Sequence, residues 1–409
     1  MRVAVFHNYY ALPGGEDVVF ELECKTLESM GHTVLPFVVR NSEVFGEASA
    51  FQKIGYAWRT PYNREIHREV SQFLKENKAD IGHVHNWFPI LSPAIYDAHH
   101  DCGIPVVQTL HNYRIGCASG TFRREEKSCH DCTPGHTLPS VRHKCYRNSR
   151  IGSLSWMRTV NRAWSNGTYT QTVDRYICPS QEVANQHRKM GLPDEKITII
   201  PNGCERPVRE SQISHQDSVS DALFVGRLTP EKGTDVAIEA WRILTKLFPP
   251  ESPPTLRIVG QGPDEERLRT LAENIPGIHF CGQQPRERVT EFLHSTKALI
   301  FPSRWAEPFG LGMIEAFSAG CPVIASNCGA PAEIIKDGVQ GFHFPVGSAP
   351  ILSEKLTLLL SDSEMREQMG LAARQHYEAN FTPEAHAEQL LSCFEKTLKE
   401  HPQSQRASQ

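Results

Sequence analysis

The sequence lacks any long hydrophobic run, and its charges nearly balance. No stretch of about 18 apolar residues occurs along the chain, so we expect no membrane-spanning helix. The formal net charge of -4 gives no reason to expect a nucleic-acid partner. The opening segment Met1–His7 becomes polar too early for a secretory signal, and it predicts a buried strand instead. These absences predict a soluble, cytoplasmic protein whose 12 cysteines are reduced thiols or metal ligands.

The length of 409 residues favours two domains, because one hydrophobic core stops growing at about 250 residues. Short apolar strands alternate with helical stretches, which is typical of parallel sheets covered by helices. A polar stretch without periodicity over 204–221 predicts a linker between a first domain, 1–203, and a second domain, 222–382. The expected strands are Val3–His7, Thr33–Val39, Asp80–His85, Pro105–His111 and Arg175–Pro179 in the first domain, and Ala222–Gly226, Leu256–Gly260, Ile278–Gly282, Ala298–Ser303 and Pro322–Ser326 in the second.

Two glutamates bracket a strand–turn–helix unit in the second domain. Glu307 follows the apolar run 298–303, and Glu315 lies about one turn inside the helix that comes next. A proline and two glycines separate the two carboxylates, so they do not flank one bond as those of a glycoside hydrolase do. Free amides from Phe309 to Gly312, at the positive end of a helix, would suit an anionic diphosphate. The alternative is an ordinary turn with surface glutamates, since such units recur in all doubly wound sheets.

The segment Glu307-Pro-Phe-Gly-Leu-Gly-Met-Ile-Glu315 resembles the E-x7-E motif of retaining glycosyltransferases with the GT-B fold, in particular glycosyltransferase family 4. The flanking Phe-Pro-Ser at 301–303 and Gly-Cys-Pro-Val-Ile-Ala-Ser at 320–326 belong to the same match, which extends over nearly the whole chain. The resemblance implies an α/β protein with two Rossmann-like, doubly wound parallel-sheet domains that face a cleft. It also implies that the last helix, over 383–400, crosses back to the first domain.

The resemblance assigns roles to residues of the second domain. Gly-Arg-Leu-Thr-Pro-Glu-Lys-Gly, from 226 to 233, is similar to the diphosphate-binding segment of the family. Arg227 and Lys232 would therefore stabilise the departing phosphate, although by themselves they could be ordinary surface cations. Glu307 would orient the sugar, and Glu315 would hold the ribose hydroxyls. The remaining contacts of the second domain with the nucleotide sugar would be Gly226, Phe309, Gly310 and Leu311.

Strand ends of the first domain supply further candidates, because open α/β sheets bind ligands at the carboxyl ends of their strands. A lone histidine is more often structural, but His111 matches the family histidine that lies near the donor sugar. His85 ends another strand and could line the acceptor side. Gly14 and Gly15 form either a flexible turn or a close approach to the donor diphosphate. The resemblance implies that this loop faces the donor diphosphate across the cleft, so we assign Gly14 and Gly15 to the nucleotide-sugar site, although the following Glu16 and Asp17 weaken the case for phosphate binding by the turn itself.

A cysteine-rich insertion interrupts the pattern at about 115–146. Its thiols have a spacing that favours a tetrahedral structural zinc site, namely Cys117, Cys129, Cys132 and Cys145. One Cys-x-x-Cys pair is a weaker signal for zinc than two, so redox-active thiols and buried thiols without a functional role remain alternatives. His130, His136 or His143 could replace one ligand. Many members of the family lack such an insertion, so the resemblance does not imply this site.

Acidic residues are absent from 133–173, while basic residues accumulate over 142–164. Trp156, Met157 and Trp164 lie between them. This stretch predicts either a solvated basic helix or contact with an anionic membrane, where each basic residue contributes about 1 kcal/mol. We favour the membrane surface, since an enzyme that extends a lipid-linked sugar needs that contact. Nucleic acid is disfavoured, because the basic stretch stands alone in an acidic chain.

The combined prediction is a retaining transferase that moves a sugar from a nucleotide-diphosphate sugar to the hydroxyl of a saccharide or lipid-linked saccharide. No Asp-x-Asp sequence occurs, so we expect no metal or other cofactor for catalysis. The alternatives within enzymes are a GT-B-like phosphorylase and a sugar-nucleotide epimerase. A non-catalytic, zinc-stabilised adaptor that binds nucleotide or lipid is the alternative outside enzymes. Absorbance of a pyridoxal cofactor would identify a phosphorylase, and release of free nucleotide would distinguish an enzyme from an adaptor.

Overall fold

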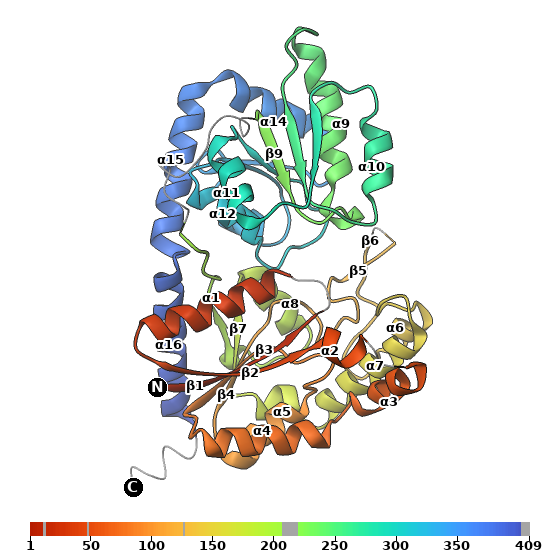
Figure 1. Ribbon diagram of the computed structural model, residues 1–409, viewed down its shortest axis with the longest axis vertical. Coiled ribbons are helices and arrows are strands. Elements are labelled where there is room, and N and C mark those ends of the chain that lie inside the picture. Colours follow the sequence, from red (N-terminus) through yellow and green to blue (C-terminus); the bar gives the residue numbers. More distant parts are fainter. Residues whose placement is uncertain (11–13, 47–48, 126, 207–219, 402–409) are drawn as a thin grey trace. The chain divides into compact units, whose positions relative to one another are not determined.

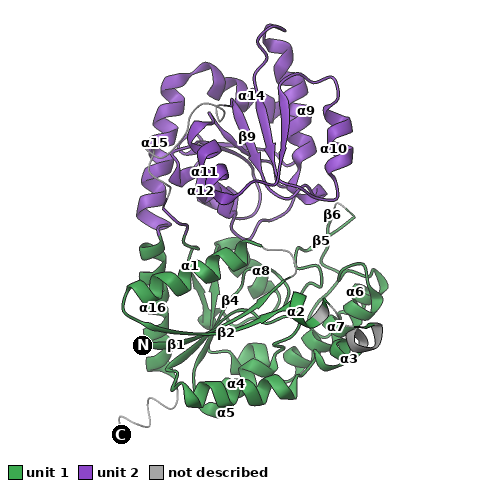
Figure 2. Ribbon diagram, in the orientation of Figure 1, with its two compact units in different colours: residues 1–203, 383–409 green, residues 204–382 purple. Residues whose placement is uncertain are grey.

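A computed structural model describes residues 1–10, 14–46, 49–125, 127–206 and 220–401. The chain divides into two compact units, and each is built around one parallel sheet. Unit 1 comprises Met1–Gly203 and Pro383–Gln409, and unit 2 comprises Cys204–Thr382 (Figure 2). Most of the predicted linker, 207–219, lies outside the described residues.

Unit 1 contains a six-stranded parallel sheet in the order β2-β1-β3-β4-β7-β8. Its strands are β1 (Arg2–Tyr9), β2 (Thr33–Arg40), β3 (Ile81–Asn86), β4 (Val106–Thr109), β7 (Arg175–Cys178) and β8 (Ile197–Ile199). The helical elements are α1 (Gly15–Ser29), α2 (Asn41–Phe45), α3 (Ala50–Arg59), α4 (Arg64–Glu76), α5 (Ala94–Cys102), α6 (Leu138–Arg142), α7 (Arg150–Ser165), η1 (Thr168–Thr172), α8 (Gln181–Lys189), η2 (Asp194–Lys196) and α16 (Pro383–Glu400). A small antiparallel hairpin lies between β4 and α6, formed by β5 (Arg123–Arg124) and β6 (Lys127–Ser128).

Helices cover both faces of this sheet, because successive residues of a strand point to opposite sides. Val5 of β1 packs with Phe20 of α1 and Phe394 of α16. The ring of Phe6, the next residue, meets Phe73 of α4 on the other face. The α1–α16 pair and the α4–α5 pair therefore lie on opposite sides of the sheet (Figure 1). The last helix of the chain thus belongs to the core of unit 1.

Unit 2 repeats this architecture with a six-stranded parallel sheet in the order β11-β10-β9-β12-β13-β14. Its strands are β9 (Ala222–Val225), β10 (Leu256–Val259), β11 (Ile278–Gly282), β12 (Leu299–Phe301), β13 (Val323–Ser326) and β14 (Gly341–Phe344). The helical elements are η5 (Pro230–Lys232), α9 (Thr234–Leu244), η6 (Thr245–Leu247), α10 (Glu265–Ala272), α11 (Arg286–Ser295), α12 (Leu311–Ser318), α13 (Ala330–Ile334), α14 (Ala349–Ser361) and α15 (Ser363–Asn380). The sequence pattern misses β14, because Gly341 and His343 interrupt its apolar run.

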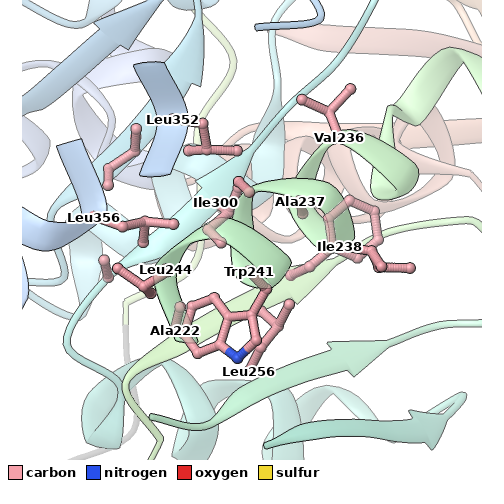
Figure 3. Packing of buried hydrophobic residues seen from close by; sticks show 14 of the residues in the cluster. Ala222, Val236, Ala237, Ile238, Trp241, Leu244, Leu256, Ile300, Leu352 and Leu356 are labelled. Carbon is pink, nitrogen blue, oxygen red and sulfur yellow. The ribbon is translucent and has the colours of Figure 1, made fainter. Parts of the chain in front are cut away.

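The core of unit 2 has a layer on each face of its sheet. On one face Trp241 of α9 is fully buried beside Ala222 and Leu256, and α14 adds Leu352 and Leu356 (Figure 3). Residues of α11, α12 and α15 pack on the other face. Truncating a buried tryptophan to alanine typically lowers the free energy of unfolding by about 3–5 kcal/mol. This layer therefore contributes strongly to the stability of the sheet in unit 2.

Candidate functional site

The predicted donor residues of unit 2 lie at the carboxyl ends of β9 and β12. β9 ends at Val225, and Gly226 and Arg227 follow directly. The Gly226 N–H donates to the carbonyl of Val259 at 3.0 Å, which extends the pairing with β10 by one residue. The Arg227 side chain is exposed just beyond this point. The strand end therefore presents a cation at the edge where open α/β sheets bind ligands.

Gly233 lets the turn η5 pass close to the end of β12. Its φ of +68° lies in the left-handed region, and a Cβ there would stand 2.0 Å from the carbonyl oxygen of Pro302. The Arg304 N–H also donates to the carbonyl of Glu231 at 2.8 Å. These contacts fasten the two loops together and fix where the Lys232 side chain begins.

Lys232 and Glu307 form an ion pair at this edge. The Lys232 Nζ lies 2.6 Å from the Glu307 Oε1, and the Ser303 hydroxyl donates to the same oxygen at 2.7 Å. Glu307 is only 5% exposed. Its backbone is also held, because the Ala330 N–H donates to the Glu307 carbonyl at 2.9 Å. A carboxylate with these partners has a fixed orientation, which a group that positions a ligand requires.

The helix α12 begins at Leu311, directly after the loop that carries Glu307. Gly310 precedes it with a φ of +91°, and a Cβ there would lie 3.2 Å from the Phe301 ring. Phe309 is buried, and its ring centroid lies 6.0 Å from that of Phe381. The first N–H groups of a helix have no acceptor within the helix, and the helix dipole is positive there. This end of α12 is therefore suited to an anion.

Glu315 lies on α12 and contacts Arg286 of α11. Arg286 bridges two carboxylates, with nitrogen–oxygen distances of 3.4 Å to Glu315 and 2.9 Å to Glu205. Burial, together with the charge of Glu205, outweighs the attraction of Arg286 and raises the pKa of Glu315. Among the described residues the Glu315 carboxylate has one weak partner, Arg286 at 3.4 Å, so a hydroxyl donor of a ligand could replace it.

The first turn of unit 1 presents carboxylates rather than free amides. Gly14 caps α1, and its N–H donates to Asp17 at 2.8 Å. The amides of Asn86 and Asn112 both donate to Glu16, at 3.2 Å each. Gly15 begins α1 and is exposed. The turn is thus lined by the carboxylates of Glu16 and Asp17, and phosphate binding by Gly14 and Gly15 stays a prediction.

The predictions for His111 and His85 need two corrections. β4 ends at Thr109, so His111 lies two residues beyond the strand and is half-buried. His85 is only 3% exposed and does not line a surface. Its Nδ1 lies 3.0 Å from the Nε2 of His111, and the two rings are stacked. Burial and the neighbouring His85 hold the pKa of His111 well below its usual range, so its ring is neutral at pH 7.

A buried cluster behind His85 was not predicted. Glu23 of α1 accepts from the His386 Nε2 at 2.9 Å, and its other oxygen lies 3.1 Å from His85 and 3.4 Å from His83. Burial alone would raise the pKa of Glu23, but the three imidazoles hold it well below its usual range. Glu23 in turn raises the pKa of His386 against the effect of burial. A glutamate among the apolar positions of α1 was the available signal, but its partners are remote in sequence.

Two family models match the chain. Residues 13–206 match "Glycosyltransferase Family 4", and residues 208–376 match "Glycosyl transferases group 1". The chain belongs to glycosyltransferase family 4. Solved structures with the GT-B fold align with nearly all of this glycosyltransferase. HepE of Anabaena, solved with UDP-glucose, aligns with 97% of this chain and 100% of its own, with a TM-score of 0.67 and 18% identity.

Curated relatives are more similar in sequence to this glycosyltransferase but align over less of their length. The uncharacterized glycosyltransferase MJ1178 of Methanocaldococcus jannaschii is 27% identical over 49% of this chain and 54% of its own length. The glycogen synthase of Mycobacterium tuberculosis is 26% identical over 74% of this chain and 66% of its own. The matched region thus spans about half to two thirds of these relatives.

Two groups of side chains in this glycosyltransferase could hold a metal. Among the described residues, one set of three ligand atoms lies within 4.8 Å, from Glu23, His83 and His85. A divalent cation there would place two further positive charges in a fully buried site whose only carboxylate already pairs with His386. This set is therefore better suited to bind protons. The second group is the cysteine quartet of the insertion, whose four members line one cavity.

The basic stretch of this glycosyltransferase is only partly available for contact. Trp156 is fully buried, and its Nε1 donates to the Arg114 carbonyl at 2.8 Å, so it faces the core and not a membrane. Arg158 and Arg162 lie over the rings of Trp58 and Tyr62. The exposed Lys and Arg residues of the stretch are Arg142, Lys144, Arg147, Arg150 and Arg162, of which the first four gather within 142–150. Searched over the described residues, the helices include none that is long and apolar enough to cross a membrane.

Proposed function

We propose that this glycosyltransferase moves a sugar from a nucleotide-diphosphate sugar to an acceptor hydroxyl with retention of the anomeric configuration and without a metal ion at the diphosphate. The observation that carries the proposal is the group of Lys232, Glu307 and Ser303, with Arg227 and the start of α12 at the same sheet edge. The binding of UDP and UDP-glucose by HepE of Anabaena supports the choice of donor.

The cations and amides of unit 2 would stabilise the leaving diphosphate. The bond between the anomeric carbon and the phosphate oxygen breaks, and the acceptor oxygen bonds to the same face of that carbon. The acceptor proton moves to the departing phosphate oxygen, so no separate base is needed. Negative charge grows on the diphosphate during this step, and fixed positive groups lower the barrier because they attract the transition state more than the substrate. Arg227, Lys232 and the first-turn amides of α12 have this role.

Glu307 would orient the sugar and stabilise its positive charge instead of attacking it. Its Oε1 already accepts two hydrogen bonds, so the carboxylate is oriented before the donor arrives. Glu315 would accept hydrogen bonds from the ribose hydroxyls in place of Arg286. His111 would donate or accept a hydrogen bond as a neutral ring, supported by His85.

Release of free nucleotide from a panel of nucleotide sugars tests the proposal. Donor preference is first read from thermal stabilisation, since a bound ligand raises the apparent stability. Glu307→Ala should lose turnover by at least about 100-fold, as expected when a transition-state contact is removed. Glu354→Ala, at an exposed glutamate of α14, is the matched control and should keep full activity. Near-normal turnover by folded Glu307→Ala would contradict the assignment.

Retention and metal independence need separate measurements. The anomeric configuration of the first product, read by NMR before equilibration, should match that of the donor. Activity should survive brief treatment with a chelator, and magnesium should not increase it. An inverted product would refute retention, and a requirement for added magnesium would refute neutralisation by protein groups alone.

We assign the acceptor to a saccharide or a lipid-linked saccharide, with unit 1 touching an anionic membrane surface. The four exposed basic residues of 142–150 lie next to Ile151 and Leu154, which are 55% and 37% exposed. A basic and apolar surface of this kind complements anionic lipid. Arg147→Glu with Arg150→Glu should abolish sedimentation with phosphatidylglycerol vesicles, while Arg366→Glu on α15 should not. Equal sedimentation with phosphatidylcholine vesicles, or none with either, would contradict the assignment.

A further inference from the structure

The four cysteines of the insertion surround one small cavity in unit 1. Cys117 lies in the loop that follows β4, Cys129 follows β6, Cys132 precedes a tight turn at 133–136, and Cys145 follows α6. The cavity has a volume of about 20 Å³, and its lining includes all four cysteines and no histidine. A space of this size holds about one water molecule, and therefore one metal ion.

The sulfurs are free and lie somewhat apart. None of the four forms a disulfide. Among the described residues, no three of their sulfur atoms lie within 4.8 Å of one another. Zinc bound to sulfur at about 2.3 Å needs sulfurs about 3.8 Å apart, so binding would draw the sulfurs closer together. The hairpin and turn that carry Cys129 and Cys132 are exposed and can move without disturbing buried packing, whereas Cys117 lies between the buried Gly116 and Ala118 and would keep its position.

The described part of the insertion from Arg123 to His136 lacks a hydrophobic core of its own, although Ile115, Ala118 and Phe122 before it are buried. Between Arg123 and His136, none of the described residues is buried. Three non-glycine residues of the insertion have left-handed backbone conformations, with φ of 49° at Phe122, 49° at Glu125 and 53° at Lys144. Each such conformation costs about 1–2 kcal/mol. A coreless, strained module of this size is typically held by a metal or by disulfides.

The surroundings of the cavity suit a negatively charged metal centre. Four thiolates and one zinc ion carry a net charge of two minus, and the cavity lining includes Arg123 and the Arg124–Asp131 ion pair, which together add one positive charge. His130, a possible substitute ligand in the sequence, stacks instead on the Phe122 ring at 4.9 Å.

We propose that Cys117, Cys129, Cys132 and Cys145 bind one structural zinc ion that holds the segment following His111. Cys117 lies six residues after His111. Between them lies Arg114, whose guanidinium contacts residues near both ends of the insertion. The Arg114 guanidinium donates to the Ala118 carbonyl at 3.1 Å and lies 5.5 Å from the ring of Tyr10 and 5.6 Å from that of Tyr146, the neighbour of Cys145. The zinc ion therefore joins the two ends of the insertion at the point where they support the loop of His111.

Metal analysis of the full chain tests the site. Purified protein dialysed against metal-free buffer should contain one zinc ion per chain. Cys129→Ser and Cys132→Ser should each lose it, and Cys281→Ser, at a half-buried cysteine of β11 in unit 2, should keep it. Unchanged zinc in both insertion variants would overturn the proposal, as would iron in place of zinc.

A second measurement on the unmodified chain avoids the possibility that the variants fail to fold. Cobalt(II) should replace the zinc and give the intense absorption of a tetrahedral centre with sulfur ligands. Stepwise titration with a mercurial should release zinc after four thiols have reacted. A cobalt spectrum without thiolate charge transfer, or a Cys129–Cys132 disulfide in protein purified with reductant, would overturn the proposal. Zinc removal should also loosen the segment 112–123, measured as faster amide hydrogen exchange there, with α9 unchanged.

Discussion

Removing either partner of the Lys232–Glu307 pair should have unequal effects on stability. The two charged atoms lie 2.6 Å apart, and the side chains are 20% exposed for Lys232 and 6% for Glu307. At an effective dielectric of about 20, charges this close attract by about 6 kcal/mol, from which the loss of hydration of both groups must be subtracted. Removing one partner of a buried pair typically costs about 3–5 kcal/mol, because the other charge remains buried and unpaired.

The asymmetry follows from which charge is left behind. Lys232→Met leaves the more deeply buried Glu307 carboxylate with Ser303 as its remaining partner at Oε1. This variant should lower the free energy of unfolding by about 3 kcal/mol. Glu307→Gln leaves a lysine that can reach water and should cost about 1–2 kcal/mol. The double variant should be less destabilised than the sum of the two by about 2 kcal/mol, since neither charge is then left alone.

Thermal and urea unfolding of the full chain measure these differences. For a unit of 150–250 residues, 1 kcal/mol corresponds to about 2–4 °C in Tm, so Lys232→Met should lower Tm by about 6–12 °C. Lys297→Met is the matched control, because Lys297 pairs with Asp221 at 2.7 Å but is 40% exposed, and an exposed pair contributes at most about 1 kcal/mol. Equal losses for the two lysine variants, or strictly additive losses in the double variant, would refute the reasoning. Both single variants at the pair should also lose transfer activity.

Three further predictions concern other parts of the molecule. Glu23 raises the pKa of His386 above 6.5, so the stability that this pair contributes is complete below pH 6.5 and is lost as the pH rises through the raised pKa. His386→Gln should therefore lower Tm at pH 6 and make Tm decline less toward pH 9. An unchanged dependence of Tm on pH would contradict this. Gly233→Ala should lower kcat and should lower the free energy of unfolding by more than about 1–2 kcal/mol, the amount expected from a left-handed φ alone. Gly338 has a similar φ but open space around it, so Gly338→Ala should lower the free energy of unfolding in urea by only that backbone contribution. Glu315→Gln should raise KM for the donor with little change in Tm. Glu205→Gln, on the other side of Arg286, should leave KM nearly unchanged. Equal KM values for the two variants would contradict a role of Glu315 in donor binding.

The sequence predicted the elements of both sheets because their signals are local. Apolar runs of four to eight residues between turn residues indicate buried parallel strands wherever they occur. The pattern failed where that signal was weak: β8 is three residues long, and β14 contains a glycine and a histidine. It also extended β4 to His111, because Leu110 continues the apolar run after the strand has ended.

The strand ends that carry the proposed donor residues of unit 2 were also visible in the sequence, since each of these residues follows a strand by a few positions. Parallel strands bring their carboxyl ends to one edge, and β9 and β12 are adjacent, so the segments that carry Lys232 and Glu307 meet once the strand order is set. The 2.6 Å pair itself depends on Gly233, where only glycine fits beside the Pro302 carbonyl. Spacing alone could not reveal that contact.

What the sequence determined by itself is therefore the alternation of strands and helices, the two-unit length and the motif of glycosyltransferase family 4. Tertiary structure alone decided that Trp156 turns inward, that His85 supports His111, and that Glu23 meets His386 across 363 positions. The physical reason is that periodicity reports the environment of each residue within its own element, whereas the partner of a buried charge depends on which elements the sheet order places side by side.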